Sequence, residues 1–118
     1  MRALLQIAMP SDVVRIDAHQ HFWTLQHEDY GWLTPDLEPL YRDFLPEDLE
    51  PLLGQAGIDR TVLVQAAATT DETRYLLDIA EHQPMVAGVV GWIDMDSPTG
   101  AIQALDEFAE HAKFVGIR

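Results

Sequence analysis

Two histidines one residue apart, His19 and His21, are the side chains whose types and spacing point most directly to chemistry. They lie in residues 14–23, where early β-branched residues and alternating polarity are typical of a short strand. Residues i and i+2 of a strand share a face, so the two Cα atoms would lie about 6.6 Å apart. Two imidazoles so placed can bind one metal ion or one substrate oxygen. Asp17 has the same parity and could orient an imidazole.

The same spacing also fits two ordinary histidines, one solvated and one hydrogen-bonded, because a competent metal site needs three or four ligands. His82 and His111 are expected in the last turns of helices, where the helix dipole stabilises an imidazolium, and neither is expected to be a ligand. His27 falls in a long loop, and both a site role and a structural role stay open for it.

Length and composition limit the possible function classes. The 118 residues make one domain or part of one, and 47% hydrophobic residues are enough for a packed core. Seven basic and twenty acidic residues give a net charge of −13, which disfavours nucleic acid and membrane surfaces as partners. The absence of cysteine excludes disulfides, a thiolate metal site and a cysteine nucleophile. No apolar run approaches the length of a membrane span, so we expect a cytoplasmic protein.

Residues 1–13 are expected to be a frayed lead, and residues 14–118 a folded portion of a domain. The long connection over residues 22–44 has no sustained period, and connections of this length in compact domains are usually functional lids or binding loops. It carries four aromatic residues, which could stack on a ring-shaped substrate or simply pack the loop onto the body: Trp23, Tyr30, Trp32 and Tyr41.

Three amphipathic helices are predicted after this loop. The first begins at Pro46 and ends at Gly57, with Pro51 predicting a kink or a late start. The second is capped by Thr70 and stops before Pro84. The third has Ser97 as its N-cap and Pro98 as its first residue, and runs to about Ala112.

Strands are predicted over residues 58–65, 85–93 and 114–118, in addition to the first one. Alternating strands and helices indicate parallel strands, arranged either as an open doubly wound sheet or as a (β/α) barrel. The first strand is not followed by the glycine fingerprint of dinucleotide-binding domains. A complete barrel takes about 250 residues. The predicted fold is therefore α/β: four parallel strands with three helices, the N-terminal part of a (β/α)8 TIM barrel.

Five segments, in order, carry a resemblance to a known family: residues 16–23 (IDAHQHFW), 43–49 (DFLPEDL), 64–66 (VQA), 89–94 (VVGWID) and 116–118 (GIR). On these motifs the sequence resembles the amidohydrolase-related (amidohydrolase 2) family. It is most similar to the branch of sugar-lactone and muconolactone-type lactonases, which includes L-fuconolactonase-like and L-rhamnonolactonase-like proteins.

This resemblance implies a TIM-barrel hydrolase that opens a lactone or related ester by water attack. His19 and His21 match the family motif that holds one divalent metal, zinc or manganese; in a metal-independent branch the same histidines would polarise a substrate carbonyl. The remaining ligands and the aspartate base would lie beyond Arg118. We therefore expect little or no hydrolytic activity from these 118 residues alone.

Candidate substrate-binding residues fall at or just after strand ends, where (β/α) barrels place their active sites. They are Trp23, Gln65, Trp92 and Arg118. Each has a structural alternative: a solvated charge for Arg118, a loop-bonding amide for Gln65 and a packed aromatic for Trp92. Asp94 is favoured as a cap of the following helix.

Three hypotheses follow from these observations. The first is a metal- or histidine-assisted lactonase acting on a small-molecule lactone or carboxylate, with a homo-oligomer possible. The second is a non-catalytic incomplete barrel that acts as an oligomerising or ligand-binding module. The third is an open-sheet domain that binds a ligand where the strand order reverses.

Overall fold

The structure is a computed structural model that describes residues 13–118, so the predicted lead over residues 1–13 falls almost wholly outside the described residues. Strands and helices alternate as the sequence predicts. Their order is β1 (Ile16–Gln20), α2 (Pro46–Ala56), β2 (Arg60–Val64), α3 (Thr70–His82), β3 (Val86–Gly91), α4 (Pro98–Phe108) and β4 (Phe114–Ile117).

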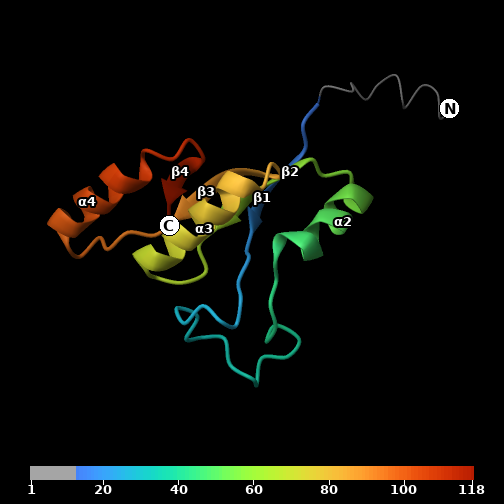
Figure 1. Ribbon diagram of the computed structural model, residues 1–118, viewed down its shortest axis with the longest axis horizontal. Coiled ribbons are helices and arrows are strands. Elements are labelled where there is room, and N and C mark those ends of the chain that lie inside the picture. The colour runs from blue at the N-terminus through green and yellow to red at the C-terminus, as the bar shows by residue number, and fades with distance from the viewer. Residues whose placement is uncertain (1–12) are drawn as a thin grey trace.

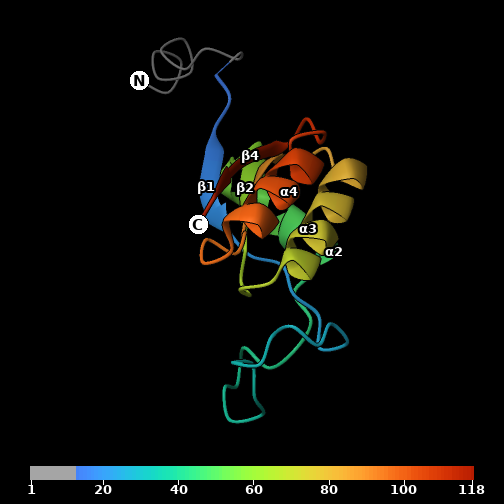
Figure 2. The same ribbon diagram turned by 90° about the vertical axis from the view of Figure 1, so that its left-hand side faces the viewer.

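The four strands form one parallel sheet in the order β1-β2-β3-β4, so each strand pairs with its neighbour in the chain. A doubly wound sheet places its ligand where this order reverses, and the described strands contain no reversal. The three helices lie together on one side of the sheet (Figures 1 and 2). This arrangement confirms the predicted α/β fold, four strands and three helices of a (β/α) barrel.

The hydrophobic core lies between the sheet and its helices. Leu63, Val86 and Val89 face Leu76 and Phe108, and all five side chains are buried. Side chains of β4 alternate between the two faces of the sheet. Val115 and Ile117 lie on the same face and remain 61% and 40% exposed. Within residues 13–118 the sheet is therefore covered on its helical side, while apolar side chains of the edge strand β4 stay accessible.

Helix α2 begins at Pro46, so the late start that Pro51 suggested is wrong. The carboxylate of Asp48 accepts the backbone N–H of Leu45 at 2.9 Å and fixes the first turn. Pro51 removes one backbone donor in the second turn and is exposed, so the helix continues past it. The predicted end is confirmed: Gly57 has φ 70° and closes the helix.

Two helix ends differ from the predictions. The N-cap of α3 is Thr69 instead of Thr70, and its hydroxyl accepts the backbone N–H of Glu72 at 3.0 Å. The N-cap of α4 is Ser97, as predicted, but this helix ends at Phe108 instead of Ala112. Its tail tightens because the backbone N–H of His111 bonds to the carbonyl of Phe108 at 3.0 Å.

His111 consequently lies after α4, and not in its last turn as predicted. His82 does lie in the last turn of α3, where its Nδ1 donates to the carbonyl oxygen of Asp78 at 2.9 Å. Across the described part of the chain, helices are too short or too polar to cross a bilayer.

The long loop between β1 and α2 extends beyond the carboxyl ends of the strands (Figure 2). Its two ends are held together by a short antiparallel bridge between Trp23 and Phe44, with backbone hydrogen bonds of 3.0 and 2.9 Å. Tyr30 and Leu33 of the loop are buried in a second, smaller hydrophobic cluster with Trp23 and with Ala67, which follows β2. The loop is therefore packed onto the sheet end and not left free.

Candidate active site

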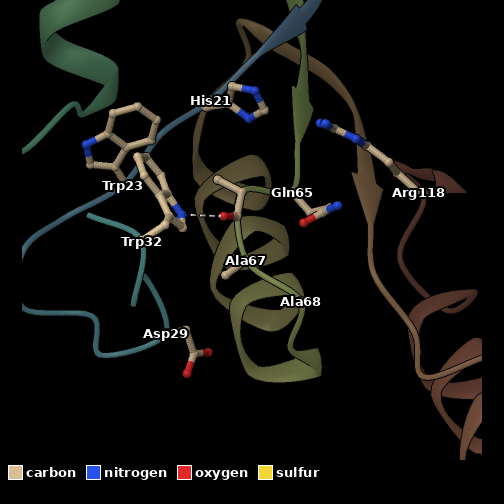
Figure 3. A pocket seen from close by; sticks show the side chains of 9 residues that line it. His21, Trp23, Asp29, Trp32, Gln65, Ala67, Ala68 and Arg118 are labelled. Carbon is tan, nitrogen blue, oxygen red and sulfur yellow. Dashed lines mark hydrogen bonds between the residues drawn. The ribbon is translucent and has the colours of Figure 1, made fainter. Parts of the chain in front are cut away.

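A cavity of about 510 Å³ lies at the carboxyl ends of the strands, under the long loop (Figure 3). This volume falls in the range of small-molecule sites. It is lined by His21, Trp23, Asp29, Trp32, Gln65, Ala66, Ala67, Ala68 and Arg118. Four of the predicted site residues are therefore brought together here: His21, Trp23, Gln65 and Arg118.

The two histidines lie on one side of the strand end, as their spacing predicts. Their ring centroids are 5.0 Å apart and the rings are nearly perpendicular, at 78°. His19 belongs to β1 and is exposed, whereas His21 follows the last residue of β1 and is half-buried. The carboxylate of Asp17 accepts the backbone N–H of His19 at 3.1 Å. Asp17 thus bonds to the strand backbone, in contrast to the predicted imidazole contact.

His21 is held in one tautomer by the neighbouring strand. Its Nδ1 lies 2.8 Å from the carbonyl oxygen of Val64, so Nδ1 carries the proton and Nε2 keeps its lone pair. Burial lowers the pKa of His21, against the opposing effect of the Val64 carbonyl, and positive charge at His19 and Arg118 lowers this pKa further. A neutral ring with a free Nε2 can accept a proton or bind a cation.

Arg118 reaches the histidine pair from the opposite edge of the sheet. Its Nη1 lies 3.4 Å from Nε2 of His19, and a hydrogen bond at this contact would run from the guanidinium N–H to the Nε2 lone pair. Figure 3 shows Arg118 and His21 pointing toward one another over Gln65. The site therefore combines a permanent cation, Arg118, with the His21 imidazole, whose Nε2 can only accept.

Two tryptophans form an apolar wall beside these polar groups. Trp23 and Trp32 pack edge to face with centroids 5.0 Å apart, and Trp23 stacks near His21. The indole N–H of Trp23 donates to the carbonyl of Arg42 at 3.0 Å, and that of Trp32 to the carbonyl of Ala66 at 2.8 Å. Both rings are thereby fixed in orientation, and Trp32 remains partly exposed to the cavity.

Sequence reasoning did not single out Asp29 and Trp32 as site residues. Both belong to the long loop, and the only signal for them was the concentration of aromatic residues in a connection of unusual length. The hydroxyl of Thr69 donates to the carboxylate of Asp29, which ties this part of the loop to the start of α3.

Trp92 follows the end of β3 but does not line the cavity. Its backbone is held by Thr73 of α3, whose hydroxyl oxygen accepts the Trp92 N–H at 2.8 Å. Asp94 accepts the backbone N–H of Asp96 at 3.0 Å and so shapes the turn before α4, while the cap itself is Ser97. His27 lies against the rings of Tyr30 and Tyr75, outside the cavity.

The histidine pair could supply two ligands of a metal site. Nε2 of His21 is available, whereas Nε2 of His19 faces Arg118. A different group of three possible ligands, found among residues 13–118, lies outside the cavity. Asp78, Glu81 and His82 form it, exposed at the end of α3. The donor set therefore fits part of a zinc site, which needs one or two further ligands.

Known proteins resemble this chain in both sequence and structure. Residues 16–118 match the family model described as Amidohydrolase. An L-fucono-1,5-lactonase of Burkholderia ambifaria is 51% identical over 104 residues, which cover 88% of this chain and 36% of that protein. An L-fucono-1,5-lactonase of Burkholderia multivorans is 42% identical over 85 residues, covering 72% of this chain and 29% of that protein.

Two crystal structures of an amidohydrolase from Burkholderia multivorans also match. One, with bound HEPES, has a TM-score of 0.80 and 38% identity over 90% of this chain and 36% of that chain. The other, with bound zinc, has a TM-score of 0.77 and 39% identity over 90% of this chain and 37% of that chain. The chain thus spans about a third of the length of these relatives. By the extent of these matches, the chain belongs to the amidohydrolase family.

Proposed function

We propose that the polypeptide carrying this chain hydrolyses a sugar lactone, with the histidine pair and Arg118 at the reacting carbonyl. The observation that carries the proposal is the convergence of two strand ends: His21 after β1 and Arg118 after β4 line one cavity from the two edges of the sheet, and Arg118 also contacts His19. The names of the two lactonase relatives support lactones as the substrate class.

Arg118 is the group suited to the carbonyl oxygen of the lactone. Its guanidinium is always protonated, and its N–H groups can donate to the oxygen as negative charge develops on it in the tetrahedral intermediate. Neutral His21 cannot perform this task, because its Nδ1 proton is committed to Val64 and its Nε2 has no proton to donate. We therefore assign carbonyl polarisation to Arg118.

His21 is instead suited to hold the attacking water. Its Nε2 lone pair can accept a hydrogen bond from water and orient the oxygen toward the carbonyl carbon. Addition of this water, followed by cleavage of the ring C–O bond and protonation of the released oxygen, gives the open hydroxy acid. The lowered pKa of His21 favours the neutral ring, which is the form that can accept a hydrogen bond from water.

The walls of the cavity suit a sugar ring. Trp23 and Trp32 present aromatic surface against which the C–H face of a ring can pack. Gln65 lies between them and Arg118, with an amide that can both donate to and accept from ring hydroxyls (Figure 3).

A divalent metal, when bound, would supply Lewis-acid polarisation of the carbonyl. His21 would hold it through Nε2, and His19 would be the second ligand. A structural relative was crystallised with zinc, which supports testing this ion first. A cation bound there would compete with Arg118 for Nε2 of His19.

The test is a lactonase assay on the longest natural polypeptide that carries this sequence. Purified protein is incubated with L-fucono-1,5-lactone and other sugar lactones, and acid release is followed by a pH indicator. We expect turnover that falls by about 100-fold or more in His21→Ala, because a water-orienting group is lost. His82→Ala, an exposed histidine of α3, is the matched control and should keep wild-type turnover. Wild-type protein without turnover on any lactone would refute the proposal.

A further inference from the structure

Residues 27–33 of the long loop dock against the link between β2 and α3. Tyr30 and Leu33 are buried there with Ala67, in the cluster that is separate from the core under the sheet. The same segment carries Trp32, whose ring lines the cavity (Figure 3). The place of this segment therefore determines the place of one cavity wall.

A chain of hydrogen bonds joins Tyr30 to Trp32 through the start of α3. The hydroxyl of Tyr30 donates to Oε2 of Glu72 at 2.9 Å, and the backbone N–H of Ala66 donates to the same oxygen at 3.2 Å. The carbonyl oxygen of Ala66 then accepts the indole N–H of Trp32 at 2.8 Å. Glu72 thus connects the docked tyrosine to the residue that orients Trp32.

Glu72 has no direct access to a substrate. Its side chain is 0% exposed and is absent from the cavity lining. Burying a carboxylate costs free energy unless it is hydrogen-bonded, and here the two donors come from the loop and from the β2–α3 link. The carboxylate therefore joins two segments that are far apart in the sequence.

We propose that Glu72 and Tyr30 are positioning residues: they hold Trp32 at the cavity and thereby set the affinity for a ring-shaped substrate. This inference rests on the proposed lactone hydrolysis. Trp32 would pack on a sugar ring equally well before and during water attack. Loss of this positioning should therefore raise KM and leave kcat nearly unchanged.

Tyr30→Phe, made in the longest natural polypeptide, tests the inference, because phenylalanine keeps the packed ring and removes the hydroxyl. Loss of one hydrogen bond to a carboxylate should raise KM about tenfold. Without substrate, solvent exchange of the Trp32 indole N–H, measured by NMR, should become faster by a similar factor. Tyr41→Phe changes an exposed tyrosine of the same loop and should alter neither quantity.

Glu72→Ala removes the bonds from both Tyr30 and Ala66, so both effects should be at least as large; the double variant should add little to Glu72→Ala, because the bond from Tyr30 is already lost. Unchanged Trp32 exchange in Tyr30→Phe, fully additive effects in the double variant, or a loss of kcat at constant KM would each overturn the inference. The exchange measurement needs no substrate. A wild-type protein that hydrolyses no lactone would thus refute the proposed function, while the indole exchange would still decide whether this pair positions Trp32.

Discussion

Arg118 and His19 are 99 residues apart, yet Nη1 of the first lies 3.4 Å from Nε2 of the second. They follow or belong to β4 and β1, the two edge strands of the sheet. In a flat sheet these strands would be about 14 Å apart, from three spacings of about 4.8 Å. The contact therefore depends on the long side chain of Arg118, which extends from the end of β4 across the strand ends toward the histidine pair (Figure 3).

This contact predicts competition between Arg118 and a metal ion. Arg118→Met removes a positive charge next to His19, so the affinity of the histidine pair for zinc should rise about tenfold or more. Isothermal titration calorimetry with zinc measures the effect directly, independently of activity. Arg60→Met, at the amino end of β2, is the matched control and should bind zinc like the wild type. Equal zinc affinity in the wild type and Arg118→Met would contradict the prediction.

The environments of His21 and His82 shift their pKa values in opposite directions. Burial lowers the pKa of His21, whereas the carbonyl of Asp78 raises the pKa of His82. In metal-free protein, NMR titration of the ring resonances should therefore give a lower midpoint for His21 than for His82. Because His21 is harder to protonate in the folded state, its contribution to stability is present above its unfolded pKa and is lost as the pH falls. Coincident midpoints would contradict this assignment.

Local sequence predicted the elements well, because caps and periodicity act over a few residues. Ser97 and Gly57 mark helix ends through bonds to residues within one turn. The choice of Thr70 over Thr69 failed since two adjacent threonines offer the same cap, and only the path of the chain decides between them. The predicted end of α4 was wrong because the chain must return to the sheet at Phe114, which packs on Phe108 with 5.6 Å between the ring centroids.

Only the site residues that directly follow strands could be predicted from the sequence. His21, Gln65 and Arg118 follow strands directly, so their meeting follows from the fold class. The residues that the loop contributes could not be predicted from the fold class. Tyr30 bonds to Glu72, 42 residues away in the sequence, and Trp32 bonds to Ala66, 34 residues away. No periodicity encodes such pairs; they depend on how an irregular loop folds back.

Glu72 predicts a pH dependence of stability. Burial and, to a smaller extent, nearby Asp29 raise the pKa of Glu72 to about 7, against the opposing effect of the hydrogen bonds from Ala66 and Tyr30. The folded protein then binds more protons than the unfolded chain between pH about 4.5 and about 7, so stability falls as the pH rises through this window. By linkage the loss amounts to about 3 kcal/mol at most.

Glu72→Gln removes this titration while keeping the shape of the side chain. Urea denaturation at pH 5 and pH 7.5 should show a smaller difference in unfolding free energy for Glu72→Gln than for the wild type. His21 and other groups titrate equally in both proteins, so comparison of the two isolates Glu72. Equal pH differences would mean that Glu72 ionises in the folded state as it does in the unfolded chain.

Gly91, at the end of β3, predicts a packing limit at the point where the strand meets α3. A Cβ atom at this position would lie 2.4 Å from Cγ2 of Thr73, a fully buried side chain whose hydroxyl accepts the Trp92 N–H. Gly91→Ala should therefore lower the free energy of unfolding by about 1–3 kcal/mol, the usual cost of overpacking. Gly54→Ala is the matched control, because its Cβ would meet no atom within 4 Å in helix α2. That change should stabilise the protein by about 0.5–1 kcal/mol, and equal effects of the two substitutions in thermal denaturation would contradict the close contact between Gly91 and Thr73.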